Sequence, residues 1–125
     1  LGYYHELISQ IIAQSDTLID YISGVLDRDW SRLDKVEQAV LLVGTYEMKY
    51  RFEVPYKVVI DEALQLNSHF GSSDGYKLVH VVMDKVAKDL RQPEVAADAK
   101  KAQHQSTAEH TQDQPPIQQQ NPSDK

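Results

Sequence analysis

Hydrophobic residues recur at intervals of three and four along most of the first 91 residues, which is the spacing of one face of an α-helix. The first run predicts a single helix of about 22 residues, roughly 33 Å long. Its apolar positions are Tyr4, Leu7, Ile8, Ile11, Leu18, Ile19, Ile22 and Val25. Between Leu7 and Ile12 they spread over more than one stripe, so we expect this end of the helix to expose hydrophobic surface unless further chain or a partner covers it.

Three further helices follow, each marked by start and stop signals. Asp34 followed by Glu37 matches a capping box and begins the second helix. Pro55 stands in the first turn of the third, Gly71 is placed to end it with a positive φ, and Asp74 is placed to cap the fourth. The apolar positions of these helices are Val36, Ala39, Val40, Val43, Tyr46, Met48 and Tyr50; Val59, Ile60, Ala63, Leu64 and Leu66; Val79, Val82, Met83, Val86 and Leu90. Helices with short loops and no strand pattern predict an all-α fold, with a long first helix followed by a three-helix bundle.

The end of the chain differs in composition. Residues 92–125 contain eight glutamines and four of the five prolines, with few apolar side chains to bury. A segment this polar does not offset its ordering entropy, so the sequence predicts a helical domain over residues 1–91 and a disordered tail over 92–125. The chain starts with Leu1 inside the helical pattern, and we expect the native product to begin further upstream.

Composition excludes several classes of function. The 125 residues carry 13 Lys and Arg against 19 Asp and Glu, a net charge of −6, which argues against a uniformly basic nucleic-acid-binding surface. The absence of Cys excludes disulfides, thiolate nucleophiles and Cys-based metal sites. No apolar run approaches the roughly 18 residues of a membrane span. The five histidines form no HxxxH or HExxH pair, and no phosphate-loop, dinucleotide or nucleophile-elbow motif is present. We therefore expect a cytoplasmic protein that is not an enzyme and uses no metal or cofactor.

One loop carries a combination of residues that suits ligand binding. The segment FGSSDGYK, residues 70–77, offers a flexible backbone, the partial positive charge of a helix N-terminus, the Tyr76 ring and the Lys77 cation. Such a set suits a phosphate or an unstacked base. The plainer interpretation of the same residues is a connector with a helix cap.

Three motifs together resemble the C-terminal half of the NusB family of transcription antitermination factors. The pattern V-E-x-A-V-L-x-x-x-x-Y-E-M occupies Val36–Met48, the signature V-P-Y-K-V-x-I-x-E-A occupies Val54–Ala63, and F-G-x-x-D-x-x-K occupies Phe70–Lys77. The resemblance covers residues 3–91 and leaves the tail unmatched.

The resemblance implies an RNA-binding adaptor. Family members pair with the small-subunit ribosomal protein NusE, and the pair binds the boxA element of nascent RNA in the antitermination complex of RNA polymerase during ribosomal RNA transcription. Carried onto this sequence, the RNA-binding residues are Phe70, Asp74, Tyr76 and Lys77, of which Tyr76 occupies a variable place in the motif. The partner-binding residue is Glu37. The resemblance leaves the oligomeric state open between a monomer and a homodimer.

Two departures from the family pattern bear on RNA binding. The arginine-rich first helix of the family is absent from this sequence, which predicts weak binding. The family's K-F-V-N-G-V-L-D-K is replaced at Lys77–Lys85, where Val81 stands in place of Gly and is expected to crowd a helix contact, and His80 stands in place of Asn. Two alternatives remain: the NusB-like leader domain of an RNA cytosine methyltransferase, and a protein-only interaction module that has lost RNA.

Overall fold

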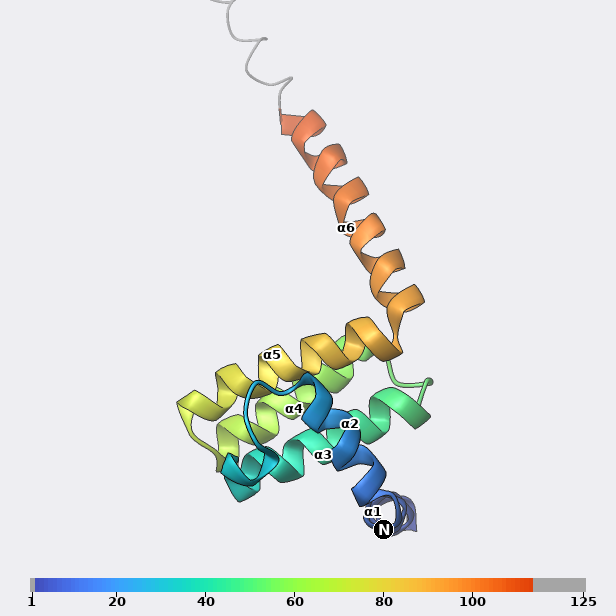
Figure 1. Cartoon of the computed structure of the whole chain (residues 1–125). Helices are drawn as coiled ribbons and strands as arrows, with labels where there is room; N and C mark the ends of the chain where they lie inside the picture. Colours follow the sequence, from blue (N-terminus) through green and yellow to red (C-terminus); the bar gives the residue numbers. More distant parts are fainter. Residues whose placement is uncertain (1, 114–125) are drawn as a thin grey trace, which may run out of the picture. The chain divides into compact units, whose positions relative to one another are not determined.

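A computed structural model of the chain describes the backbone of residues 2–113 and the side chains of residues 2–103. The elements are α1 (Gly2–Ala13), α2 (Ser15–Val25), the 3₁₀ helix η1 (Trp30–Arg32), α3 (Lys35–Tyr50), α4 (Tyr56–Phe70), α5 (Ser73–Leu90) and α6 (Gln92–Asp113) (Figure 1). Residues 2–113 contain no strand. The all-α fold predicted from the sequence is confirmed for this part of the chain.

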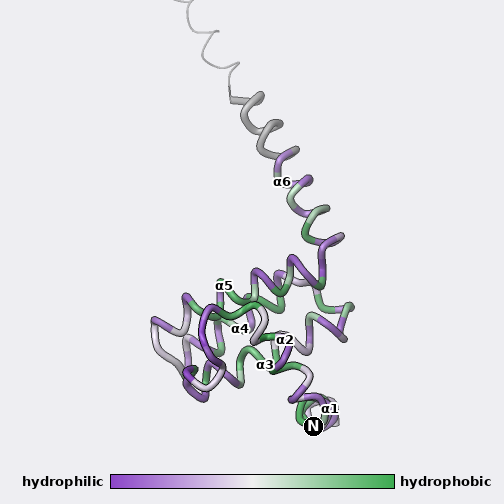
Figure 2. Tube along the Cα trace, viewed as in Figure 1, coloured by the Kyte–Doolittle hydropathy of each residue, from purple (hydrophilic) through white to green (hydrophobic). Residues whose placement is uncertain are grey.

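Helices α3, α4 and α5 pack against one another, and α2 lies against α3 and α5. Hydrophobic stretches recur along these helices (Figure 2). The buried positions largely follow the predicted stripes, with differences in α3 and α4: Leu41 is fully buried although the predicted stripe omits it, whereas Ala39, Tyr50 and Leu66 are exposed. A helix with neighbours on two sides buries more than one stripe, which explains the additional position.

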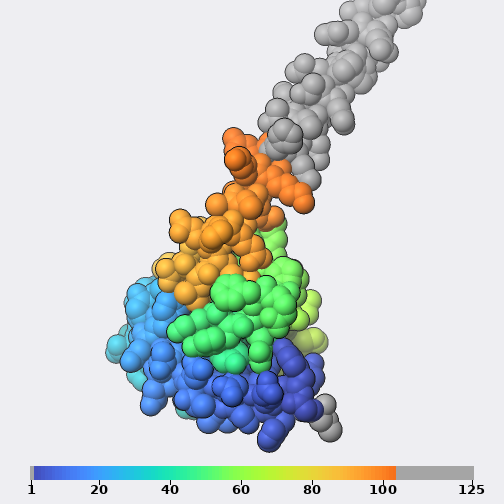
Figure 3. All heavy atoms as spheres, turned by 90° about the vertical axis from the view of Figure 1, so that its right-hand side faces the viewer, coloured from blue at the N-terminus to red at the C-terminus, as the bar shows by residue number. Residues whose placement is uncertain are grey.

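The predicted long first helix is two helices. It breaks at Gln14, and both pieces contribute to one small core cluster of Leu7, Ile11, Leu18 and Tyr46. The Tyr50 hydroxyl donates a hydrogen bond to Gln14 Oε1 over 2.6 Å at the break. Figure 1 shows α1 turned out of the line of α2, and Figure 3 shows both lying against the segment around residue 50. The bend lets both halves reach α3, which the apolar spacing alone does not reveal because it stays helical across the break.

The predicted cap of α3 is confirmed and those around α5 are corrected. Asp34 Oδ1 accepts a hydrogen bond from Glu37 N at 2.7 Å, and Glu37 Oε1 accepts one from Asp34 N at 2.9 Å, which forms the full capping box. Gly71 ends α4 in extended backbone with φ −119° and not with a positive φ. Ser72, and not Asp74, caps α5 by accepting a hydrogen bond from Gly75 N at 3.1 Å. Asp74 lies in the first turn, where its charge favours the helix.

A buried arginine fastens the end of α5 to the turn between α3 and α4. The Arg91 side chain donates hydrogen bonds to the backbone carbonyls of Glu47, Met48, Arg51 and Val54 at 2.8–3.2 Å. Its guanidinium also lies 4.7 Å from the centre of the Phe52 ring. The carbonyls of Glu47 and Arg51 also accept backbone hydrogen bonds, from Arg51 N and Val54 N, so Arg91 is an additional donor to these two. Carbonyls near a helix C-terminus carry partial negative charge, which compensates the buried cation.

The chain divides into two compact units between Gln92 and Pro93. The sequence predicts a disordered tail from residue 92; residues 92–113 form α6, and residues 114–125 lie outside the described residues. The sequence holds five alanines between residues 92 and 113, together with Gln, Lys and Glu, and these residue types favour a helix locally even where there is little apolar surface to bury.

Candidate nucleic-acid interface

The loop singled out by the sequence is a hydrogen-bonded corner between α4 and α5. Asn67 binds it twice: its carbonyl oxygen accepts a hydrogen bond from Gly71 N at 2.7 Å, and its Nδ2 donates to the Ser72 carbonyl at 3.0 Å. The Asn67 side chain is fully buried. The expected flexible backbone is therefore pinned, and the start of α5 has a fixed position relative to α4.

Asn67 also explains why two glycines stand in this corner. A Cβ added at Gly71 would lie 2.5 Å from Asn67 Oδ1, and one added at Gly75 would lie 2.9 Å from the same oxygen and 2.9 Å from Glu37 Oε2. The three helices thus meet here with no room for a methyl group. The residue carried over as partner-binding, Glu37, is half-buried and lies at the same corner as the proposed RNA-binding residues.

Sequence reasoning missed Asn67. The available signal is its spacing, because Asn67 follows Ile60, Ala63 and Leu64 on the buried stripe of α4. A polar residue at such a position needs hydrogen-bonding partners, and the neighbouring loop supplies one for Nδ2, whereas the buried Oδ1 accepts no hydrogen bond among the described residues.

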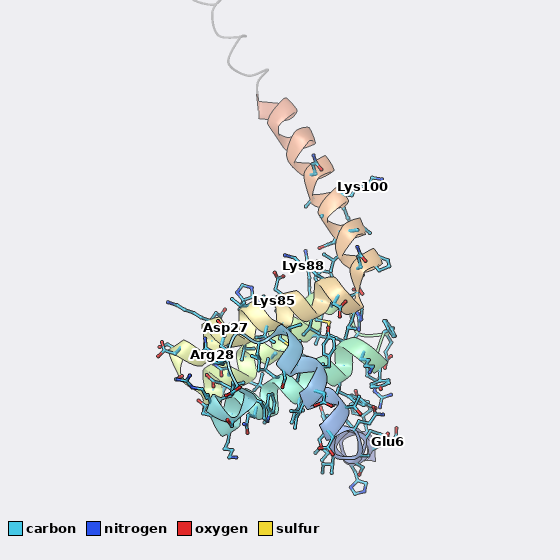
Figure 4. The ribbon with its side chains drawn as sticks, viewed as in Figure 1. Glu6, Asp27, Arg28, Lys85, Lys88 and Lys100 are labelled. Carbon is cyan, nitrogen blue, oxygen red and sulfur yellow. The ribbon has the colours of Figure 1, made fainter. Side chains whose placement is uncertain are left out.

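Asp74 and Lys77 share one groove. It has a volume of about 400 Å³ and lies between the end of α2, the turn that follows it and α5. Its lining residues are Val25, Asp27, Arg28, Asp74, Lys77, Leu78, Val81, Val82 and Lys85. Figure 4 shows Asp27 and Arg28 beside α5, near Lys85. The groove thus joins cations from segments about fifty residues apart in the sequence.

The charges in this groove are unequally paired. Arg28 Nε donates a hydrogen bond to Asp27 Oδ1 at 2.9 Å, and this contact lowers the pKa of the Asp27 carboxyl and raises that of Arg28. Among the described residues, no carboxylate lies within 4.0 Å of the Lys77 or Lys85 ammonium group. Two cations on one wall are therefore open to a phosphate.

Tyr76 lies on a different side of α5 from Lys77. It lines a depression of about 250 Å³ between α4 and α5, together with Asp61, Leu64, Gln65, Ser68 and His69. The Tyr76 ring meets the exposed His80 ring edge-on, with centroids 6.5 Å apart. Phe70, 72% exposed, stands at the end of α4 beside His69. Of the four residues predicted to bind RNA, the structure brings Asp74 and Lys77 into one groove and places Tyr76 outside it.

The sequence predicts that Val81, which replaces a glycine of the family pattern, crowds a helix contact. This prediction is wrong, because the Val81 side chain faces solvent. Val81 is 53% exposed and lines the groove beside Lys77 and Lys85. A side chain in this position widens the apolar wall of the groove without displacing a neighbouring helix.

A second, more apolar groove lies between α1 and helices α3 and α4. Its volume is about 540 Å³, and Tyr3, Tyr4 and Ile8 form part of its wall. Of the four apolar residues between Leu7 and Ile12, Ile8 and Ile12 are more than half exposed, whereas Leu7 and Ile11 are buried. The expected exposed hydrophobic surface is thus found at half of these positions.

The part of the chain that the structure describes contains no group of three or more His, Asp or Glu residues placed to hold a metal ion. Within the same part, no helix is both long enough and apolar enough to cross a membrane.

Comparison with known proteins identifies the fold family. The model of the NusB family matches residues 1–88. The chain belongs to the NusB family. The match covers α1 to α4 and nearly all of α5, including the corner and the groove beside Lys77.

Relatives with the name "Transcription antitermination protein NusB" support the assignment. The protein from Psychrobacter cryohalolentis is 54% identical over 100 residues, which are 80% of this chain and 32% of the relative. The protein from Acinetobacter baylyi is 48% identical over 94 residues, 75% of this chain and 63% of the relative. The protein from Chromohalobacter salexigens is 44% identical over 97 residues, 78% of this chain and 58% of the relative. The chain spans less than two thirds of the length of these NusB proteins, and their name is not that of an enzyme.

Proposed function

We propose that this NusB-family chain acts in transcription antitermination in the cytoplasm by binding boxA-type single-stranded RNA at the α4–α5 corner. The observation that carries the proposal is the groove beside the start of α5 in which Lys77 and Lys85 stand without an ion pair among the described residues. The exposed Phe70 ring lies outside this groove, at the end of α4. Phosphates bind such cations, and unpaired bases stack on exposed rings, so a net acidic protein can hold RNA at one local site.

The protein partner in this proposal is NusE, docked near Glu37, within the antitermination complex of RNA polymerase. Glu37 lies beside Gly75, in the first turn of α5, so a partner at this position would stand next to the RNA. Two ligands bound side by side stabilise one another where they contact each other, and by linkage each then raises the affinity for the other by the same factor. The expected result is tighter RNA binding in the presence of NusE.

A titration with boxA and scrambled RNA, each with and without NusE, tests this function. Lys77→Ala is expected to weaken binding of boxA RNA and to reduce the slope of log affinity against log salt by about 0.7, the value for one phosphate contact on a single strand. Lys49→Ala is the matched control, because it removes the same charge at the opposite end of α3 from the corner.

Three results discriminate the alternatives. Equal binding of boxA and scrambled RNA, unchanged by Lys77→Ala, contradicts the proposed site. Binding of NusE with no RNA binding at all favours the protein-only module. A methyltransferase domain in the same open reading frame favours the leader-domain alternative.

A further inference from the structure

We propose that the depression lined by Tyr76 holds a single unpaired nucleobase, separately from the groove that holds the RNA backbone. The inference rests on the proposed function and assigns a second ligand site within it. The depression measures about 250 Å³, below the size of a pocket for a drug-sized molecule, and lies open to solvent between α4 and α5. Its size suits one planar ring and not a folded segment of protein.

The walls of the depression offer a stacking surface. The Tyr76 ring is 42% exposed, and the His80 ring supports it from the next turn of α5 at an interplanar angle of 60°. The exposed His69 side chain contributes from α4 on the other side, and Leu64 adds a buried apolar surface. Bases removed from their own stack bind such aromatic and imidazole faces because stacking replaces the lost base–base contact.

The rim of the depression is polar and indicates which bases fit. Asp61 presents a carboxylate, which only accepts hydrogen bonds when ionised, while Gln65 and Ser68 both donate and accept. An exocyclic amino group is the donor on a base edge that a carboxylate pairs with. The set therefore favours a base that carries an amino group, such as adenine or cytosine, over uracil.

The two sites lie on neighbouring faces of α5, where one strand of RNA can reach both. Tyr76 and Lys77 are consecutive on α5, so their side chains leave the helix about 100° apart. Lys77 lines the groove toward α2, and Tyr76 lines the depression toward α4. A strand with its phosphates against Lys77 and Lys85 can turn one base over the start of α5 into the depression.

Fluorescent RNA tests this assignment with the full chain. The probe is boxA-type RNA in which 2-aminopurine, an amino-bearing base whose emission is quenched by stacking, replaces one base at a time. We expect quenching on protein binding to be strongest at one position. Tyr76→Leu should abolish that quenching and weaken RNA binding by roughly 5-fold or more, whereas Tyr76→Phe should retain both.

Control variants separate this site from the groove. Tyr4→Leu removes a ring that is 64% exposed on α1, away from the corner, and should change neither quenching nor affinity. Lys77→Ala should weaken affinity but leave the quenching of the bound complex. Asp61→Asn should reduce the preference for an amino-bearing base over uracil at the same position.

The outcomes are distinguishable from those for the proposed function. If Tyr76→Leu binds and quenches as the unmodified chain does while Lys77→Ala weakens binding, the base site is wrong and the proposed function stands. If the unmodified chain with NusE binds no RNA, both are wrong. Equal loss of binding in Tyr76→Leu and Tyr76→Phe also overturns the base site, because stacking is then not what Tyr76 supplies.

Discussion

Replacement of Arg91 by Met tests whether one side chain holds the end of α5 to the turn between α3 and α4. Arg91 is 2% exposed and donates four hydrogen bonds to backbone carbonyls. Met fills similar space but offers no donor. The carbonyls of Glu47 and Arg51 keep hydrogen bonds of 3.0 Å from Arg51 N and Val54 N, whereas those of Met48 and Val54 lose the hydrogen bond from Arg91 where water has little access. An unsatisfied buried acceptor costs about 1–3 kcal/mol.

The magnitude follows from how many of these carbonyls remain without a partner. Because the carbonyls of Glu47 and Arg51 retain backbone donors, the other two, of Met48 and Val54, cost together about 3 kcal/mol. This value lies at the lower end of the usual cost of removing one partner of a buried charged pair. For a unit of this size, such a loss lowers Tm by roughly 12–24 °C. Arg91→Lys keeps the charge but not the planar set of donors. We therefore expect its Tm to lie between that of the unmodified chain and that of Arg91→Met.

Urea and thermal unfolding measure the effect. Trp30, the only tryptophan, lies in η1 and reports the unit that contains Arg91, so its fluorescence avoids the signal of α6. Lys88→Met is the control, because it removes an exposed cation from the same helix and a surface ion pair with Asp84 of little worth. Arg91→Met with the same unfolding midpoint as the control would refute the argument that these carbonyls depend on Arg91.

Three further outcomes follow from the same structure. Gly75→Ala should destabilise the chain by about 1–3 kcal/mol in urea unfolding, because the added methyl group lies 2.9 Å from Asn67 Oδ1; unchanged stability would show that the corner yields. The Tyr21 hydroxyl donates to Asp89 Oδ2 at 2.6 Å, and burial with this bond raises the pKa of Tyr21. Its stabilisation is complete below the unfolded pKa of about 10 and is lost above it, so Tyr21→Phe should reduce the fall in Tm above pH 10, and an identical pH profile would contradict this. Ile12→Glu should reduce binding of a hydrophobic dye, since Ile12 is 67% exposed; an unmodified chain that binds no dye would exclude such a surface.

The sequence predicts only those parts of the candidate site whose residues lie close together along the chain. Asp74 and Lys77 lie three residues apart on one helix, so helical spacing brings them to the same side once α5 is recognised. Arg28 belongs to the same groove, but it lies in a turn nearly fifty residues earlier and no local pattern connects the two. The roles of Phe70, Asp74, Tyr76 and Lys77 in RNA binding and of Glu37 in partner binding stay predictions.

Apolar spacing and the capping box of Asp34 and Glu37 act within a few residues, so the sequence alone predicts where helices form up to residue 90, although not the break at Gln14. The sequence also contains the helix-forming residues of α6, although its polar composition predicts disorder there. Tertiary structure decided the bend at Gln14, the close contact between Glu37 and Gly75, and the burial of Arg91. Each of these depends on carbonyls, hydroxyls or close contacts supplied by a distant helix, and a hydrogen-bond partner far along the chain leaves no periodic trace in the sequence.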